Sequence, residues 1–217
     1  MNADITAKDT ILARIRNAEP KAKNETEMQR EYAAIVRTYQ REGNLSRDEK
    51  LHLFEDRLRE YDAGVYHATS DSMMGTIEQV LHGRGVHRLA VPEGLPETWL
   101  PQGFAYLPAD GLAAADLDRV DGVLSGCTLA IAITGTIVLQ NAPRQGPRKL
   151  SLVPDYHLCV VFEDQVVETV PEAFAHLEST SRLPTTLISG PSATADIEMT
   201  RIRGVHGPRR LDVVLVS

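Results

Sequence analysis

The stretch DGVLSGCTLAIAITGTIVLQ (Asp121–Gln140) is the longest apolar block of this 217-residue sequence. Its aliphatic and β-branched residues favour strands. Only Thr134-Gly135-Thr136 joins the strand-like pieces LAIAITG and TIVLQ, and a connection this short predicts a hairpin. The connector APRQGPRK (142–149), which leads on to SLVPDYHLCVV, predicts a second hairpin for the same reason.

The segments on either side of this block alternate between short strands and helices. We expect strands at VYHAT, HRLAVP and FAYLP before it, and at TTLIS and LDVVLV after it. Helical segments are expected near SMMGTIEQVLHGR, AAADLDRV and PEAFAHLEST. This alternation predicts an α/β domain over residues 65–217, a three-layer sandwich with a mixed, mostly parallel sheet covered by helices.

Residues 1–64 predict an N-terminal helical extension. One apolar stripe has helical spacing and consists of Met28, Tyr32, Ile35, Val36 and Tyr39. A further helix is expected to begin at the capping box Ser46–Glu49 and to end at Gly64. Because these stripes are narrow, we expect the helices to clamp onto the later domain.

The bulk composition excludes several classes of function. The formal charge is −7, from 23 basic and 30 acidic residues, which argues against a nucleic-acid partner. The two cysteines form no CxxC pattern, so we expect no iron–sulfur cluster and no metal site in this chain. No apolar stretch is long enough to span a bilayer, so we expect a cytoplasmic protein without membrane insertion.

Two segments are candidate ligand-binding sites, because ligands of open α/β sheets collect at the carboxyl ends of strands. In the first, Thr134, Gly135 and Thr136 combine hydroxyl donors with a glycine that lets backbone approach a ligand. The second, SGPSAT, follows a strand and opens a predicted helix, whose first amides suit an anion. Its candidate residues are Ser189, Gly190, Ser192 and Thr194. A tight turn and a helix cap are the respective alternatives.

Charged and titratable residues near these segments supply candidates for chemistry. Asp196, Glu198 and His206 are the candidate catalytic groups, as a general base or as acid–base groups. The alternative is structural: carboxylates are favoured in a first helical turn, and His206 lies between glycines in a loop. Arg148, in a basic Gly/Pro-rich connector, is a candidate anion ligand or else a solvated hairpin residue. His157, in PDYH before a strand, is a further candidate.

Two of these segments together resemble a known family. Ala130–Val161 and Ile188–Val216, with SGPSATADIE followed by GVHGPR, resemble the lactate-utilisation protein C family of LUD-domain proteins. The resemblance implies a fold like that of ribose-5-phosphate isomerase and the CoA transferases. It also implies a role in oxidising L-lactate to pyruvate beside partner proteins that carry iron–sulfur clusters. One position departs from the family, which commonly has a glutamate before the TGT turn where this chain has Ile133.

The sequence is compatible with three functions. The chain is a component of a lactate-oxidising system that binds a small anionic ligand, either as a catalytic or as an accessory, non-catalytic subunit. Alternatively, it is an independent isomerase or CoA-transferase-type enzyme on a phosphorylated or acyl substrate, with Glu198 as the candidate nucleophile. In the third reading it is a binding module whose N-terminal helices contact a partner.

Overall fold

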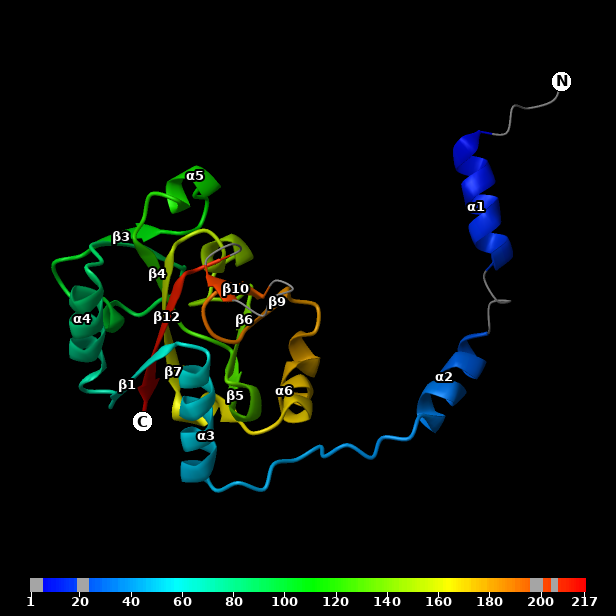
Figure 1. Ribbon diagram of the computed structural model, residues 1–217, viewed down its shortest axis with the longest axis horizontal. Helices are drawn as coiled ribbons and strands as arrows, with labels where there is room; N and C mark the ends of the chain where they lie inside the picture. Colours follow the sequence, from blue (N-terminus) through cyan, green and yellow to red (C-terminus); the bar gives the residue numbers. More distant parts are fainter. Residues whose placement is uncertain (1–5, 19–23, 196–200, 204–206) are drawn as a thin grey trace. The chain divides into compact units, whose positions relative to one another are not determined.

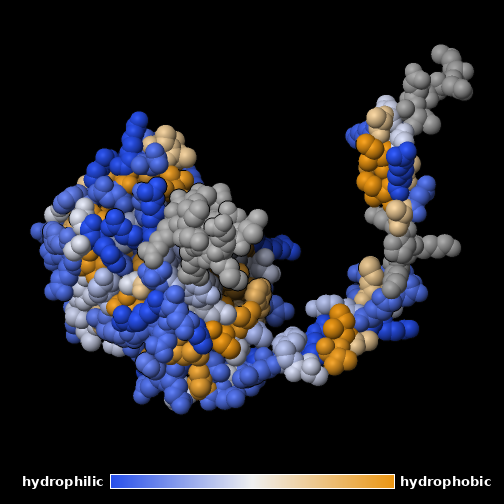
Figure 2. Space-filling model, in the orientation of Figure 1, coloured by the Kyte–Doolittle hydropathy of each residue, from blue (hydrophilic) through white to orange (hydrophobic). Residues whose placement is uncertain are grey.

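The computed structural model describes residues 6–18, 24–195, 201–203 and 207–217. The chain divides into two units, Met1–Tyr39 and Gln40–Ser217. The first unit holds α1 (Ala7–Ala18) and α2 (Glu25–Ala34), and neither helix has a buried residue. Figure 2 shows apolar side chains on the surface of both helices.

The second helix is shorter than the apolar pattern predicts. It ends at Ala34, because Ile35 adopts an extended conformation. The guanidinium of Arg37 donates to the carbonyl oxygens of Tyr32 and Ile35 and so satisfies acceptors that a longer helix would have used. The predicted helical stripe through Val36 and Tyr39 is therefore wrong beyond residue 34.

The second unit contains a parallel sheet of six strands in the order β1-β12-β7-β4-β2-β3 (Figure 1). Neighbouring strands are parallel throughout. Their bounds are Gly64–Ala68 (β1), Arg88–Val91 (β2), Ala105–Pro108 (β3), Gly122–Ser125 (β4), Tyr156–Phe162 (β7) and Arg210–Val216 (β12). The predicted α/β class with a mostly parallel sheet is confirmed.

The remaining strands form two smaller sheets. One has the order β8-β5-β6-β9, and β5 and β6 form the predicted hairpin through residues 134–136. Strands β10 and β11 form an antiparallel pair. The bounds are Leu129–Ile131 (β5), Thr136–Gln140 (β6), Val166–Val167 (β8), Thr185–Ile188 (β9), Ala193–Ala195 (β10) and Arg201–Arg203 (β11).

The second predicted hairpin, through residues 142–149, is wrong. Strand β6 already has β5 and β9 as neighbours, and β7 lies between β12 and β4. With both edges of each strand occupied, the connector crosses from the small sheet to the large one. The short 3₁₀ helix η3 (Arg148–Ser151) lies in this crossing, with Leu150 buried.

Helices and the small sheet cover the two faces of the large sheet. Helix α4 (Met73–Arg84) packs on one face. Helix α3 (Arg47–Glu60) and the small sheet pack on the other, and α6 (Val170–Leu177) covers the outer face of the small sheet. A short helix α5 (Ala114–Leu117) completes a satellite core with β2 and β4. None of the helices in the described ranges has the length and apolarity needed to cross a bilayer.

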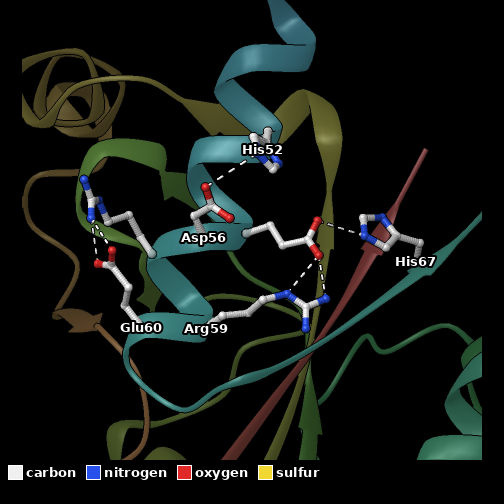
Figure 3. Close-up of polar contacts among 7 residues, drawn as sticks. His52, Asp56, Arg59, Glu60 and His67 are labelled. Carbon is white, nitrogen blue, oxygen red and sulfur yellow. Dashed lines mark hydrogen bonds and ion pairs between the residues drawn. The ribbon is translucent and has the colours of Figure 1, made fainter.

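Helix α3 is integral to the second unit. It begins with the predicted capping box, in which Ser46 and Glu49 exchange side-chain and backbone hydrogen bonds. Its Phe54 and Leu58 are 0% exposed. On its surface Glu55 accepts from Arg59 at 2.5 Å and lies 3.0 Å from the Nε2 of His67 on β1. Figure 3 shows these contacts, together with ion pairs along the helix.

The end of α3 differs from the prediction. The helix ends at Glu60, and the left-handed residue that follows is Asp62, with φ of 64°. Gly64, which was expected to end the helix, instead begins β1. A Cβ at Gly64 would lie 2.2 Å from the Oδ1 of Asp212, so this glycine permits the close approach of a buried carboxylate.

Candidate functional site

The two glycine-containing segments predicted as ligand sites lie side by side. Strand β6 pairs with β9, with Ile137 opposite Ile188, and this register places Thr136 next to Ser189. Their hydroxyl oxygens are 2.7 Å apart, and the Oγ1 of Thr134 lies 2.7 Å from that of Thr136. The structure therefore joins the TGT turn and the SGPSAT segment through a chain of three hydroxyls.

Both glycines face helix α3. A Cβ added at Gly135, where φ is +56°, would lie 2.7 Å from the Cβ of Arg57. One added at Gly190, where φ is +79°, would lie 2.4 Å from the Cβ of Tyr61. Only glycine combines a positive φ with so close an approach of another backbone. The close neighbour of Gly135 is α3 itself, and that of Gly190 is Tyr61, the residue at the end of α3.

A cavity of about 280 Å³ has Ser189 among its lining residues. It is formed by η3, the first residues of β7 and β12, strand β9 with the loop that follows it to Ala193, and Gly207-Pro208. Its volume is just below the range of about 300–1,000 Å³ that is typical of small-molecule sites. The predicted residues Arg148, Ser189, Gly190 and Ser192 line it.

The cavity lies at the amino ends of β7 and β12 and at the carboxyl end of β9. His157 and Leu211 are the second residues of β7 and β12 and are paired in register. Side chains alternate along a strand, so His157 shares its face with Cys159 and Val161, which pack against the small sheet. The cavity therefore meets the expectation of a site at the carboxyl ends of strands for β9, whose last residues and following loop line it, and departs from it for β7 and β12. It borders the packing of two sheets, whereas that rule describes a single open sheet.

The rim and the floor of the cavity differ in polarity. Arg148 is exposed and donates from Nη1 to the Oγ1 of Thr186 at 2.6 Å. It has no ion pair with a carboxylate in the described ranges, and no described lining residue is acidic. The floor consists of the buried side chains of His157, Leu211 and Ser151, which are 1%, 2% and 9% exposed.

His157 is a neutral imidazole in the floor of the cavity. Its Nε2 lies 2.8 Å from the Oγ of Ser125 on β4. Its Nδ1 is buried and has no hydrogen-bond partner among the described residues. Burial lowers the pKa of His157 to about 4, because the charged imidazolium would lose its hydration. The cavity therefore combines one exposed cation, several hydroxyls and an uncharged imidazole.

Several predicted residues lie away from this cavity or outside the described ranges. Thr134, Gly135 and Thr136 are not among its lining residues. The candidate catalytic groups Asp196, Glu198 and His206, and the side chain of Thr194, lie outside the part of the chain that the structure describes. Whether any of these residues binds a ligand or takes part in chemistry stays a prediction.

The helix expected after Ser192 is wrong. Residues Ala193–Ala195 form strand β10, which pairs with Arg201–Arg203. The amides of this segment are therefore not those of a helix N-terminus, and they do not form the anion site that a helix start would offer. Thr186, Ser151 and Leu211 were not predicted as lining residues. Strand pairing brings Thr186 and Leu211 to the cavity, the crossing connector brings Ser151, and no local motif marks any of the three.

Ile133, where the family commonly has glutamate, lies apart from the cavity. Its side chain is 51% exposed, and its amide donates to the carbonyl of Glu168 at 3.1 Å. The residue is not among those that line the cavity. Isoleucine at this position therefore removes no group from the cavity.

The fold defines the class of protein: an α/β domain in which a six-stranded parallel sheet packs against a smaller, mostly antiparallel one. The LUD domain matches residues 51–216 of the sequence. The chain therefore belongs to the LUD domain family. The match includes the described cavity and most of α3.

Two relatives of the chain are named for lactate utilisation. The chain is 47% identical to "Lactate utilization protein C" of Deinococcus radiodurans, over 80% of this chain and 82% of that protein. It is 27% identical to "Lactate utilization protein C" of Anoxybacillus flavithermus, over 79% and 82%. A crystal structure of a DUF162 family protein from Deinococcus radiodurans is 44% identical, with a TM-score of 0.71, covering 80% of this chain and 100% of that chain.

Proposed function

We propose that this protein is a component of a system that oxidises L-lactate to pyruvate, and that its cavity binds a small anionic ligand. The observation that carries the proposal is the 47% identity, over 80% of the chain, to a protein named for lactate utilisation. The cavity supports it, because Arg148 and the hydroxyls at its rim offer donors to a carboxylate and no described lining residue repels an anion.

The proposal assigns the electron-transfer clusters to partner proteins. An iron–sulfur cluster takes four cysteine thiolates in its usual form, and this chain has only Cys127 and Cys159. Both are buried free thiols in the structure. In this proposal the chain holds the small acid or organises the assembly, while the iron–sulfur partners carry the electrons.

Growth on L-lactate tests the proposed role. A strain that lacks this gene and any paralogue is expected not to grow on L-lactate and to grow normally on pyruvate. The tagged protein is expected to copurify with iron–sulfur proteins from lactate-grown cells. Normal growth of the deletion strain on L-lactate would contradict the proposal.

Thermal denaturation in the presence of candidate ligands tests binding to the cavity. L-Lactate and pyruvate are expected to raise the melting temperature with concentration, because a ligand that binds only the folded state stabilises it. Arg148→Ala should weaken this binding by roughly tenfold to a hundredfold, since a hydrogen bond to a charged group contributes about 1.5–3 kcal/mol. The exposed Arg182, which does not line the cavity, gives the matched control Arg182→Ala, with no expected effect. Stabilisation by a sugar phosphate or an acyl-CoA and by neither acid would indicate the alternative, isomerase- or transferase-type function.

A further inference from the structure

Nδ1 of His157 is buried and unpartnered, whereas buried polar groups in folded proteins normally have hydrogen-bond partners. The residue is 1% exposed and lines the floor of the cavity. Within the described ranges, Nδ1 of His157 is the only buried side-chain nitrogen or oxygen without a hydrogen-bond partner. Because leaving a buried polar group unsatisfied destabilises a fold, such a nitrogen at the floor of a cavity calls for a partner.

The neighbours of Ser125 indicate which ring nitrogen of His157 carries the proton. The Oγ of Ser125 lies 2.8 Å from the Nε2 of His157 and 4.0 Å from the Sγ of Cys159. A neutral imidazole nitrogen is a much better acceptor than a thiol sulfur at the longer distance. The hydroxyl of Ser125 therefore donates to Nε2, and the imidazole proton is on Nδ1.

The same geometry excludes Ser125 as a nucleophile. Its side chain is 1% exposed and is not part of the cavity lining. Its hydroxyl bonds the Nε2 of His157 and so fixes the imidazole proton on Nδ1. His157, a lining residue of the cavity, thus carries its proton on the unpartnered Nδ1 as a neutral N–H donor.

The cavity therefore has two ends that suit different parts of one ligand. The charged end is the exposed Arg148 with the hydroxyl of Thr186. The buried end is an uncharged imidazole beside the apolar Leu211. A carboxylate at the buried end would lose its hydration without a cation to compensate, so the buried end favours an uncharged oxygen.

We infer that the Nδ1–H of His157 donates a hydrogen bond to the hydroxyl or carbonyl oxygen of a small hydroxy- or oxo-carboxylate whose carboxylate group lies at Arg148. This inference rests on the proposed function, and it names the group that distinguishes such acids from simple carboxylates. His157 is a binding and specificity residue, and Ser125 is a positioning residue that acts through it.

A ligand series on the full-length chain tests the inference. Calorimetric titration with L-lactate, pyruvate and propionate compares acids with and without the second oxygen. The wild-type protein should bind L-lactate and pyruvate roughly threefold to tenfold more tightly than propionate, the usual range for one net neutral hydrogen bond. Binding of L-lactate but not of pyruvate would overturn the inference, because an Nδ1 without a proton can only accept a hydrogen bond and therefore selects hydroxyls over carbonyls.

Variants at position 157 remove or retain the donor. In His157→Leu the preference over propionate should disappear, while propionate itself keeps its affinity. In His157→Asn, whose amide N–H lies near the position of Nδ1, the preference should remain. His176→Leu is the control, because His176 is exposed on α6 and does not line the cavity. An unchanged preference in His157→Leu would overturn the inference.

A measurement on the wild-type protein covers the case in which the leucine variant fails to fold. The ¹⁵N resonances of the histidine rings report which nitrogen carries the proton and whether it gains a hydrogen bond. Nδ1 of His157 should be protonated and should shift on addition of L-lactate but not of propionate. Failure of wild-type protein to bind any of the three acids would overturn this inference, whereas growth on L-lactate and copurification decide the proposed role separately.

Discussion

His157 illustrates how one side chain links the stability of the fold to the charge of the cavity. An unfolded histidine has a pKa of about 6.5, and burial lowers that of His157 to about 4. Between these two values the unfolded chain takes up a proton that the folded protein does not. Stability therefore falls as the pH falls through this window, and His157 makes no contribution to the pH dependence above it.

We predict that His157 contributes a loss of about 3 kcal/mol to the free energy of unfolding between pH 6.5 and pH 4. The measurement is urea unfolding of the wild type and of His157→Asn across this range. The wild type should lose stability more steeply than the variant, and the exposed control His176→Asn should follow the wild type. Equal slopes for wild type and His157→Asn would show that residue 157 is not buried in its neutral form.

Among the secondary-structure elements, α4, β7 and β12 are joined by a buried ionic cluster. Asp212 on β12 is 0% exposed and accepts two hydrogen bonds from Arg84 of α4, both at 2.7 Å. It also accepts from the hydroxyl of Tyr156 on β7 at 2.9 Å. Burial, together with the carboxylate of Asp212, raises the pKa of Tyr156 well above its usual value. Three elements distant in sequence thus depend on one carboxylate.

We predict that Asp212→Asn destabilises the protein by about 3 kcal/mol or more, because it leaves the partly buried Arg84 without its counter-charge. The matched control is Asp155→Asn. Asp155 pairs with Arg209 at 3.4 Å on the surface, where it is 70% exposed, and the loss there should be below about 1 kcal/mol. Thermal and denaturant unfolding of both variants give the comparison. Similar losses of stability in the two variants would mean that the buried cluster stabilises the protein no more than a surface ion pair does.

At the scale of the whole molecule, the boundary between the helical extension and the α/β domain is open to test. The sequence places it at residue 64, whereas the contacts divide the chain between Tyr39 and Gln40. The segment after Gln40 is bound to the second unit, since the amides of Gly43 and Leu45 donate to Glu172 and Glu168. The core residues Phe54 and Leu58 follow in α3.

We predict that a chain beginning at Gln40 retains the melting temperature of the full protein within a few degrees. A chain beginning at Val65 lacks α3 and should not fold, because it exposes the core that Phe54 and Leu58 cover and uncovers the backbone at Gly135. Circular dichroism and calorimetry of the two shortened chains decide between the boundaries. A stable chain from Val65 would support the division at residue 64.

Local signals in the sequence predicted most of the elements. The apolar runs that became β1, β7 and β12 need no partner to be recognised, and the capping box at Ser46 is a local exchange of hydrogen bonds. The signals failed where an element depends on its neighbours. Residues 193–195 were expected in a helix and pair with residues 201–203 as a strand. The connector after β6 was expected to form a hairpin, and it crosses between sheets because both strands have other partners.

The candidate site shows the same division. The amino-acid types by themselves determined that this chain has few thiols, a net negative charge and an α/β pattern, and the two signature segments determined its family, since these properties depend on residue identity and local order. Only the tertiary structure decided that Gly135 and Gly190 pack against α3, and that His157 lies at the floor of the cavity with one nitrogen unpartnered. Contacts of this kind join residues far apart in the chain, and they arise when sheets and helices pack together to remove apolar surface from water.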